Sequence, residues 1–165
     1  MKNNSQQNKT ALMKATDLLA LQEQSSKVLK KKLAARKYGE EEIDAAIDKL
    51  KKYNYINDEE TCRRQFENFY SAGKLSVRQI CVKLIHRGFD SDFVKKLVPD
   101  DTDEHELTAA TIALEKKFRR EKFGGDSREK MKFKNKMWSH LSGKGFDTEI
   151  INSAVENFLS DFDGN

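Results

Sequence analysis

Basic and ionisable residues four positions apart are the side chains of this sequence best suited to chemistry with a partner. Three such pairs occur: Lys32 with Arg36, Lys83 with Arg87, and His140 with Lys144. Residues four apart share one face of a helix, so each pair presents two cations on the same side. Lysine and arginine in such positions bind phosphates or carboxylates. The candidate binding residues are the lysines and arginines of these pairs and the cations that surround the third pair: Lys32, Arg36, Lys83, Arg87, Lys116, Arg119, Arg120, Lys132, Lys136 and Lys144.

Charge is unevenly distributed along the 165-residue chain, although the net charge is only +4. Residues 25–39 carry six Lys or Arg and no acid, and residues 115–146 carry eleven against four acids. Residues 147–165 carry five acids and no Lys or Arg. This segregation indicates a negatively charged partner, either nucleic acid or an acidic protein surface. The alternative is that the cations pair with acids on a neighbouring helix, where an exposed pair contributes only about 0–1 kcal/mol.

The other reactive residue types form no catalytic pattern. Each histidine lacks a second His, Cys or paired carboxylate at ligand spacing, so the sequence predicts no metal site at His86, His105 or His140. The Gly124-Gly125 pair lacks the GK[ST] ending of a phosphate-binding loop. We therefore predict that the protein is not an enzyme and needs no cofactor.

The two cysteines and the lengths of the apolar runs indicate the cellular compartment of the protein. Cys62 and Cys81 form no CxxC pair and are expected to be reduced core thiols. No apolar run approaches the roughly 18 residues that a membrane helix requires. The polar start, Met1 to Thr10, has no hydrophobic signal core. We expect a cytoplasmic monomer that does not contact a membrane.

An internal repeat positions the basic pairs. Residues 29–47, 80–98 and 137–155 align without gaps at offsets of 51 and 57 residues. Five apolar columns coincide in all three copies: Leu29/Ile80/Met137, Leu33/Leu84/Leu141, Tyr38/Phe89/Phe146, Ile43/Val94/Ile151 and Ile47/Val98/Val155. The spacing of four within each helix predicts a buried face. Trp138 falls where Lys30 and Cys81 stand in the other copies, so the repeat does not require it, and it is a candidate exposed aromatic together with Tyr55.

Helix boundaries follow from turn and capping residues. Gly88 and Gly145 permit the left-handed turn that ends a helix, and Lys37 stands at the equivalent place in the first copy. The following residues, Gly39, Asp90 and Asp147, are the predicted N-caps of the next helix. A further helix precedes each pair, and capping boxes are predicted at Asn57 with Glu60 and at Asp103 with Glu106. Gly124, Gly125 and Asp126 separate the first two helices of the third copy.

The expected fold is all-α, with three tandem three-helix, helix-turn-helix-like repeats in an elongated curved array. The predicted division is a disordered tail at 1–10, repeats at 11–54, 55–99 and 100–160, and a C-terminal tail at 161–165.

The sequence resembles the RecX family of bacterial recombination regulators. The resemblance is carried by YINDEE at 55–60, SVRQICVKLIHRGFD at 76–90 and ALMKATDLLALQEQSSKVLKKKL at 11–33, and it extends over about residues 11–160. It implies a crescent of three-helix repeats that binds the RecA filament on single-stranded DNA and inhibits its ATPase and strand exchange. Departures from the family pattern are Lys83 where Glu is common, Thr61-Cys62 in place of Phe-Ala, and Lys37 in place of glycine.

Two other functions remain open at the level of sequence. One is a DNA-binding protein that acts alone; it would bind without sequence preference, because no helix carries an Arg, Asn or Gln constellation for reading bases. The other is a helical adaptor for an unrelated protein, with the concave face of the array as its groove.

Overall fold

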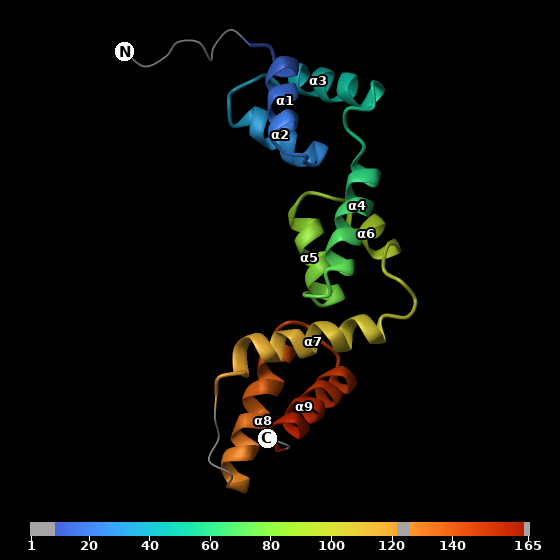
Figure 1. Cartoon of the computed structure of the whole chain (residues 1–165). Coiled ribbons are helices and arrows are strands. Elements are labelled where there is room, and N and C mark those ends of the chain that lie inside the picture. Colours follow the sequence, from blue (N-terminus) through green and yellow to red (C-terminus); the bar gives the residue numbers. More distant parts are fainter. Residues whose placement is uncertain (1–8, 122–125, 164–165) are drawn as a thin grey trace, which may run out of the picture. The chain divides into compact units, whose positions relative to one another are not determined.

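The computed structural model describes residues 9–121 and 126–163, and all regular structure in these ranges is helical (Figure 1). The helices are α1 (Ala11–Leu21), α2 (Ser26–Ala34), α3 (Glu40–Lys52), α4 (Asp58–Ser71), α5 (Val77–His86), α6 (Ser91–Lys96), α7 (Asp103–Phe118), α8 (Ser127–Ser142) and α9 (Thr148–Asp163). We call α1–α3 the first module, α4–α6 the second and α7–α9 the third. The prediction of an all-helical repeat fold is confirmed for the described part of the chain.

Two predicted features fall partly or wholly outside the described residues. Most of the expected N-terminal tail, residues 1–8, lies outside them, as do Lys122, Gly124 and Gly125. At the other end, α9 continues to Asp163 and so includes residues 161–163, which the sequence placed in a tail.

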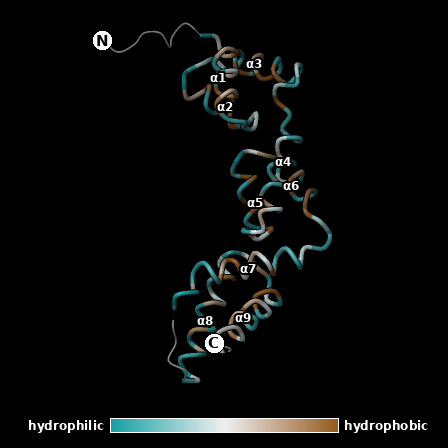
Figure 2. The backbone as a smooth tube through the Cα atoms, in the orientation of Figure 1, coloured by the Kyte–Doolittle hydropathy of each residue, from teal (hydrophilic) through white to brown (hydrophobic). Residues whose placement is uncertain are grey.

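The chain divides into two compact units, each with its own core. One contains the residues up to Gln65 together with Leu84–Val94, and the other contains Phe66–Lys83 together with the residues from Lys95 onward. Apolar residues recur among polar ones along the helices, as expected for helices that bury one face (Figure 2).

In the first unit the helices of the first module pack on one another through their apolar faces. The core there contains Ala15, Leu18, Leu29, Leu33, Ile43, Ile47, Leu50 and Ile56. In the second unit the helices of the third module enclose a larger core of aromatic and aliphatic side chains. Its members include Leu114, Phe118, Phe133, Met137, Leu141, Phe146, Ile151, Val155 and Phe158. Three of the five predicted columns are buried in all three copies. In each of the other two columns one member, Tyr38 or Val98, is only half-buried.

Equivalent turns end the second helix of each module. Lys37, Gly88 and Gly145 adopt positive φ angles of 66°, 89° and 85°, as their alignment predicts. The helices end one or two residues before the last basic position of each pair, because α2, α5 and α8 end at Ala34, His86 and Ser142. The prediction that both members of each pair lie on one helix is therefore wrong for Arg36, Arg87 and Lys144, which lie in the turn.

The predicted caps are confirmed at three sites and wrong at a fourth, and one of the three is Gly39, the N-cap of α3. Asn57 Oδ1 accepts from the Glu60 amide at 3.1 Å, and Asp90 Oδ1 accepts from the Phe93 amide at 2.9 Å. Asp103 is not an N-cap; Thr102 occupies that position and α7 begins at Asp103. The Glu106 carboxylate accepts instead from the amide of Val77 at 2.6 Å.

Candidate functional site

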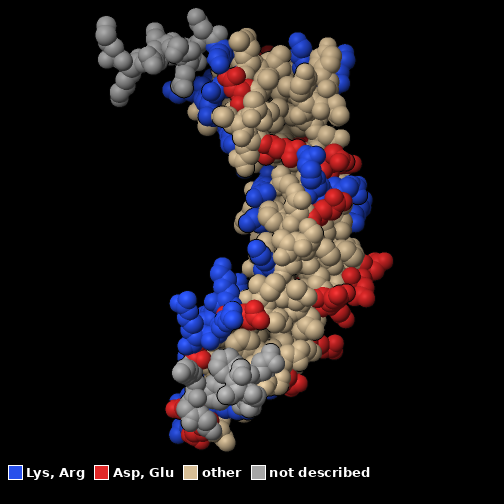
Figure 3. Space-filling model, in the orientation of Figure 1, with Lys and Arg blue, Asp and Glu red and all other residues tan. Residues whose placement is uncertain are grey.

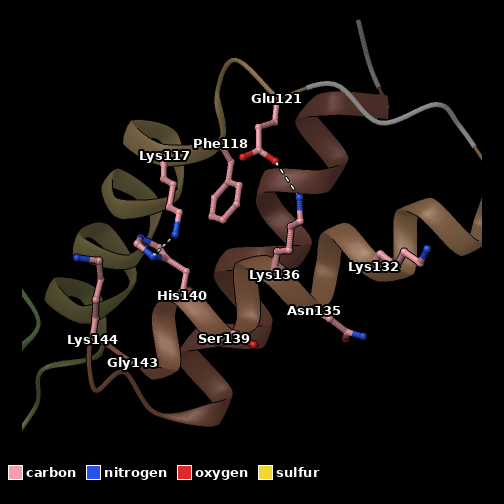
Figure 4. Close-up of a pocket in the computed structure, with 10 residues that line it drawn as sticks. All are labelled: Lys117, Phe118, Glu121, Lys132, Asn135, Lys136, Ser139, His140, Gly143 and Lys144. Atoms are coloured by element: carbon pink, nitrogen blue, oxygen red, sulfur yellow. Dashed lines mark hydrogen bonds and ion pairs between the residues drawn. The ribbon is translucent and has the colours of Figure 1, made fainter.

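The third module carries an open groove of about 1010 Å³ that is rich in lysine (Figure 4). Its walls come from the end of α7, one face of α8 and the turn that follows α8. The lining residues are Lys117, Phe118, Glu121, Lys132, Asn135, Lys136, Ser139, His140, Gly143 and Lys144. We call this site the basic groove.

The sequence of α8 explains why its cations face the groove. Lys132, Lys136 and His140 are spaced by four residues and lie on one face of the helix. Another face of the same helix carries Phe133, Met137 and Leu141, all buried in the core. Burial of this apolar face fixes the rotation of α8 about its axis, and thereby turns the basic face outward.

His140 and Lys117 form the polar floor of the groove. Lys117 Nζ lies 3.1 Å from His140 Nδ1, and the two side chains point toward each other in Figure 4. The His140 ring also packs edge-on against Phe118, with ring centroids 5.7 Å apart. Burial, followed by the charges of Lys117 and Lys144, lowers the pKa of His140. A neutral ring can accept a hydrogen bond from the Lys117 ammonium, which matches the short distance.

The positive charge of the groove is only partly balanced. Glu121 Oε2 lies 3.7 Å from Lys136 Nζ, and both side chains are exposed, so the pair contributes about 0–1 kcal/mol. Among the described residues, neither Lys132 nor Lys144 forms an ion pair with a carboxylate. The groove therefore holds four lysines against one acid and attracts anions.

A second hollow of about 440 Å³ adjoins the C-terminal end of α7. It is lined by Ile112, Glu115, Lys116, Lys117, Arg119 and Arg120, and so shares Lys117 with the basic groove. In Figure 3 basic residues gather over this end of α7, and acidic residues gather over its other end. Both placements are favoured by the helix dipole.

The structure brings six of the ten predicted residues together in the third module. Lys132, Lys136 and Lys144 line the basic groove, and Lys116, Arg119 and Arg120 line the adjoining hollow. Lys117 lines both sites but is not among the residues that the sequence predicts for binding, although it belongs to the same basic run of α7 as Lys116.

The other four predicted residues belong to the first two modules. Lys32 is half-buried on α2, and its carbonyl oxygen accepts from Arg36 Nη1 at 2.6 Å. Lys83 Nζ lies over the Phe69 ring at 5.1 Å from the centroid, which is a cation–π geometry. Arg87 donates to the side-chain oxygen of Gln65 at 2.5 Å.

The two aromatic candidates lie outside the basic groove. Trp138 is 37% exposed and Tyr55 is 70% exposed, and neither lines the basic groove. Among the residues whose side chains the structure describes, 9–121 and 126–160, there is no group of three His, Cys, Asp or Glu residues that could hold a metal ion. No helix in the same ranges is long and apolar enough to cross a membrane. The groove can bind an anion through its lysine side chains.

Three tandem three-helix modules, the third of which carries an open, lysine-lined groove, define a helical-repeat protein. Residues 11–50 match the family model for the first three-helix domain of RecX, and residues 103–155 match that for its third three-helix domain. The chain belongs to the RecX family, whose members are regulatory proteins.

Individual relatives agree with this assignment. The regulatory protein RecX of Clostridioides difficile is 31% identical over 147 residues, which are 89% of this chain and 67% of that protein. The regulatory protein RecX of Neisseria meningitidis serogroup B is 28% identical over 158 residues, 93% of this chain and 94% of that protein. The chain thus spans about two thirds of the clostridial relative and nearly all of the neisserial one. The crystal structure of RecX from Lactobacillus salivarius shares the fold, with a TM-score of 0.69 at 21% identity over 89% of this chain and 93% of that one.

Proposed function

We propose that this protein is a non-enzymatic regulator that binds the RecA filament on single-stranded DNA and inhibits its ATPase and recombinase activities. It would act as a cytoplasmic monomer in DNA repair and recombination, including the SOS response. The observation that supports this most directly is the basic groove, which lies within the segment that matches the third RecX domain.

The chemistry of the groove suits a polymeric anion. Its cations stand on two helices and a turn, and an open groove admits an extended chain without requiring a free end. Lysine side chains recognise charge and carry little sequence information, so contacts with a phosphate backbone would be independent of base sequence. Such a surface can follow a filament whose subunits and phosphates repeat regularly.

The test is a titration of DNA-dependent ATP hydrolysis by the cognate RecA with this protein. We expect hydrolysis to fall as the protein approaches stoichiometry with RecA, and a K132E/K136E double variant to inhibit less. A K51E/K52E variant is a suitable control, because it reverses two exposed charges at the end of α3. Unchanged hydrolysis at stoichiometric protein would rule the proposal out.

The open, basic character of the groove also supports a second candidate, a DNA-binding protein that acts without RecA. In that case affinity for naked DNA would be high and would fall steeply with salt. Tight binding to DNA combined with no effect on RecA would favour this function. A pull-down from the native host that returned other proteins and no RecA would instead favour a helical adaptor.

A further inference from the structure

Trp138 is the single tryptophan of the chain, and the repeat does not require it. The equivalent position is Lys30 in the first module and Cys81 in the second, and Lys30 is exposed and pairs with Asp44 at 2.5 Å. Trp138 is not part of the core of the third module, to which the neighbouring Met137 belongs. A large aromatic side chain at this place is therefore not explained by packing.

Met131 and Trp138 form an exposed apolar strip on α8. Met131 is 60% exposed and Trp138 is 37% exposed. They are seven residues apart in one helix, so they lie on one face about two turns from each other. Among the described residues, the indole ring of Trp138 has no stacking and no cation–π contact. Part of an unpartnered aromatic ring is thus open to solvent.

The apolar strip runs beside the basic groove on the same helix. Asn135 lines the groove, and it follows Met131 by four residues and precedes Trp138 by three. Residues three or four apart are neighbours on a helix surface, with about 5–6 Å between their Cβ atoms. Lys132 and Lys136 line the groove from the same helix. A ligand that lies along α8 can therefore contact these lysines and the indole together.

The charge beside the apolar strip is balanced, whereas the charge of the groove is not. Lys134 lies three residues after Met131 and four before Trp138, and its ammonium is 3.9 Å from the carboxylate of Glu156. The groove holds four lysines against one acid. The surface of α8 thus offers a cationic face for an anion and, next to it, an apolar strip for an uncharged flat group.

We propose that Trp138 is a stacking platform for a base of single-stranded DNA whose phosphates bind in the basic groove. The inference rests on the proposed function only in taking single-stranded DNA as the polymer. Every nucleotide carries an anionic phosphate and a flat base, and proteins that hold single strands combine a positively charged groove with aromatic side chains. An acidic protein surface matches the lysines alone. Stacking tolerates any base, so this contact is as independent of base sequence as the phosphate contacts.

The first measurement is the fluorescence of Trp138 during a titration with oligo-dT at low salt, without RecA. Because the chain has one tryptophan, excitation beyond the absorption of tyrosine reports this residue alone. We expect oligo-dT to quench the emission. An abasic oligomer of equal length keeps every phosphate and lacks every base, so it should bind with little quenching. K132E/K136E should quench less at the same oligo-dT concentrations, because the strand is held less tightly in the groove.

The second measurement compares the affinities of variants for the two oligomers. W138A should bind oligo-dT about 5-fold to 100-fold more weakly and should bind the abasic oligomer as the unaltered protein does. The slope of log affinity against log salt concentration should not change, because stacking releases no counterions. W138F keeps a ring and should lose less affinity. Y55A is the matched control, since Tyr55 is 70% exposed and belongs to the other compact unit; it should change neither affinity.

Four results would overturn the stacking platform. They are the absence of binding by the unaltered protein at low salt, unquenched fluorescence in a sample saturated with oligo-dT, undiminished quenching in K132E/K136E, and an equal loss of affinity for both oligomers in W138A. Thermal melting of each variant checks that the fold is intact.

The platform and the proposed function can fail separately. If W138A bound oligo-dT normally but inhibited RecA less, the apolar strip would contact protein, so the platform would be refuted and the proposed function would stand. If the quenching and the affinities were as expected but the unaltered protein left ATP hydrolysis by RecA unchanged, the platform would stand and the proposed function would be refuted.

Discussion

The ammonium of Lys117 lies 3.1 Å from Nδ1 of His140, so a cation and a titratable ring meet at the floor of the basic groove. Burial and two neighbouring lysines hold the pKa of His140 below its usual value. A bound polyanion would offset the charges of Lys117 and Lys144 and so reverse part of this effect. His140 is therefore a natural reporter of occupancy in the groove.

The first prediction is that a bound polyanion raises the pKa of His140. Titration of the imidazole followed by nuclear magnetic resonance, with and without oligo-dT, measures this directly. His86, which lies at the end of α5 and does not line the groove, is the internal control. An identical His140 titration in a sample saturated with oligo-dT would show that the polymer binds elsewhere.

The same lowered pKa has a consequence for stability. The unfolded chain takes up a proton at His140 near pH 6.5, before the folded chain does. The contribution of the neutral His140 ring to the free energy of unfolding is thus fully present above that pH, and it is lost as the pH falls through the lower pKa of the folded state. An H140Q variant should lose less stability than the unaltered protein between about pH 7.5 and pH 5.5, as measured by urea unfolding.

The second prediction concerns the basic surface of the third module as a whole. Reversal of Arg119, Arg120, Lys132 and Lys136 to Glu should abolish most inhibition of RecA while leaving helix content and melting nearly unchanged. All four side chains are exposed, and the Glu121–Lys136 pair is the only ion pair that they form among the described residues. Full inhibition by this variant would exclude the third module as the contact site.

Much of this architecture can be predicted from the sequence because it depends on local rules. Leu33, Leu84 and Leu141 are fully buried, as their shared column requires. The positive φ of Lys37 also follows from its alignment with Gly88 and Gly145.

What the sequence did not predict depends on contacts between distant segments. Glu106 has the spacing of a capping-box residue for its own helix, yet it binds the amide of Val77, 29 residues away. Lys27 and Arg78 fall just before the aligned segments, and only packing against the turns at Gly88 and Gly145 reveals them as equivalent. Extending the gapless alignment by two residues would have paired them, but would not have shown what they touch.

The third prediction tests the equivalence of the turns. A lysine with positive φ costs the folded state about 1–2 kcal/mol of strain. Replacement by glycine removes this strain, but part of the gain is lost because glycine is more flexible in the unfolded chain. K37G should therefore raise the free energy of unfolding by about 0.5–1 kcal/mol. G88A should lower it by about 1–3 kcal/mol, because its φ is positive and its Cβ would lie 2.6 Å from Ser25 Oγ.

G39A is the matched control for these variants. Gly39 has an ordinary φ of −66°, and a Cβ atom there would meet nothing within 4 Å. G39A should lower the free energy of unfolding only because alanine is a weaker N-cap than glycine, by on the order of a few tenths of a kcal/mol. Urea unfolding of all three variants gives the comparison, and a loss in K37G as large as that in G88A would contradict the equivalence of the turns.

The fourth prediction concerns Glu106, whose carboxylate accepts a hydrogen bond from the amide of Val77 at the start of α5. Burial raises its pKa, although the hydrogen bond from Val77 and the charge of His105 lower it. Its second oxygen, Oε2, is buried and has no hydrogen-bond partner. Because the folded-state pKa is raised, the stabilising contribution of the neutral form is present below about pH 4.3 and is lost as the pH rises through the folded-state value.

E106Q should therefore keep the acceptor for Val77 and remove the buried charge, with a change in stability at neutral pH of about 0–1 kcal/mol in favour of the variant. E106A should instead lower the free energy of unfolding by about 1–3 kcal/mol, because the Val77 amide loses its acceptor. Urea unfolding of both variants at about pH 5 and pH 8 separates the two effects, since only the charge effect depends on pH. Equal destabilisation by E106Q and E106A at both pH values would mean that the ionised carboxylate itself, and not merely an acceptor oxygen, stabilises the contact between Glu106 and the start of α5.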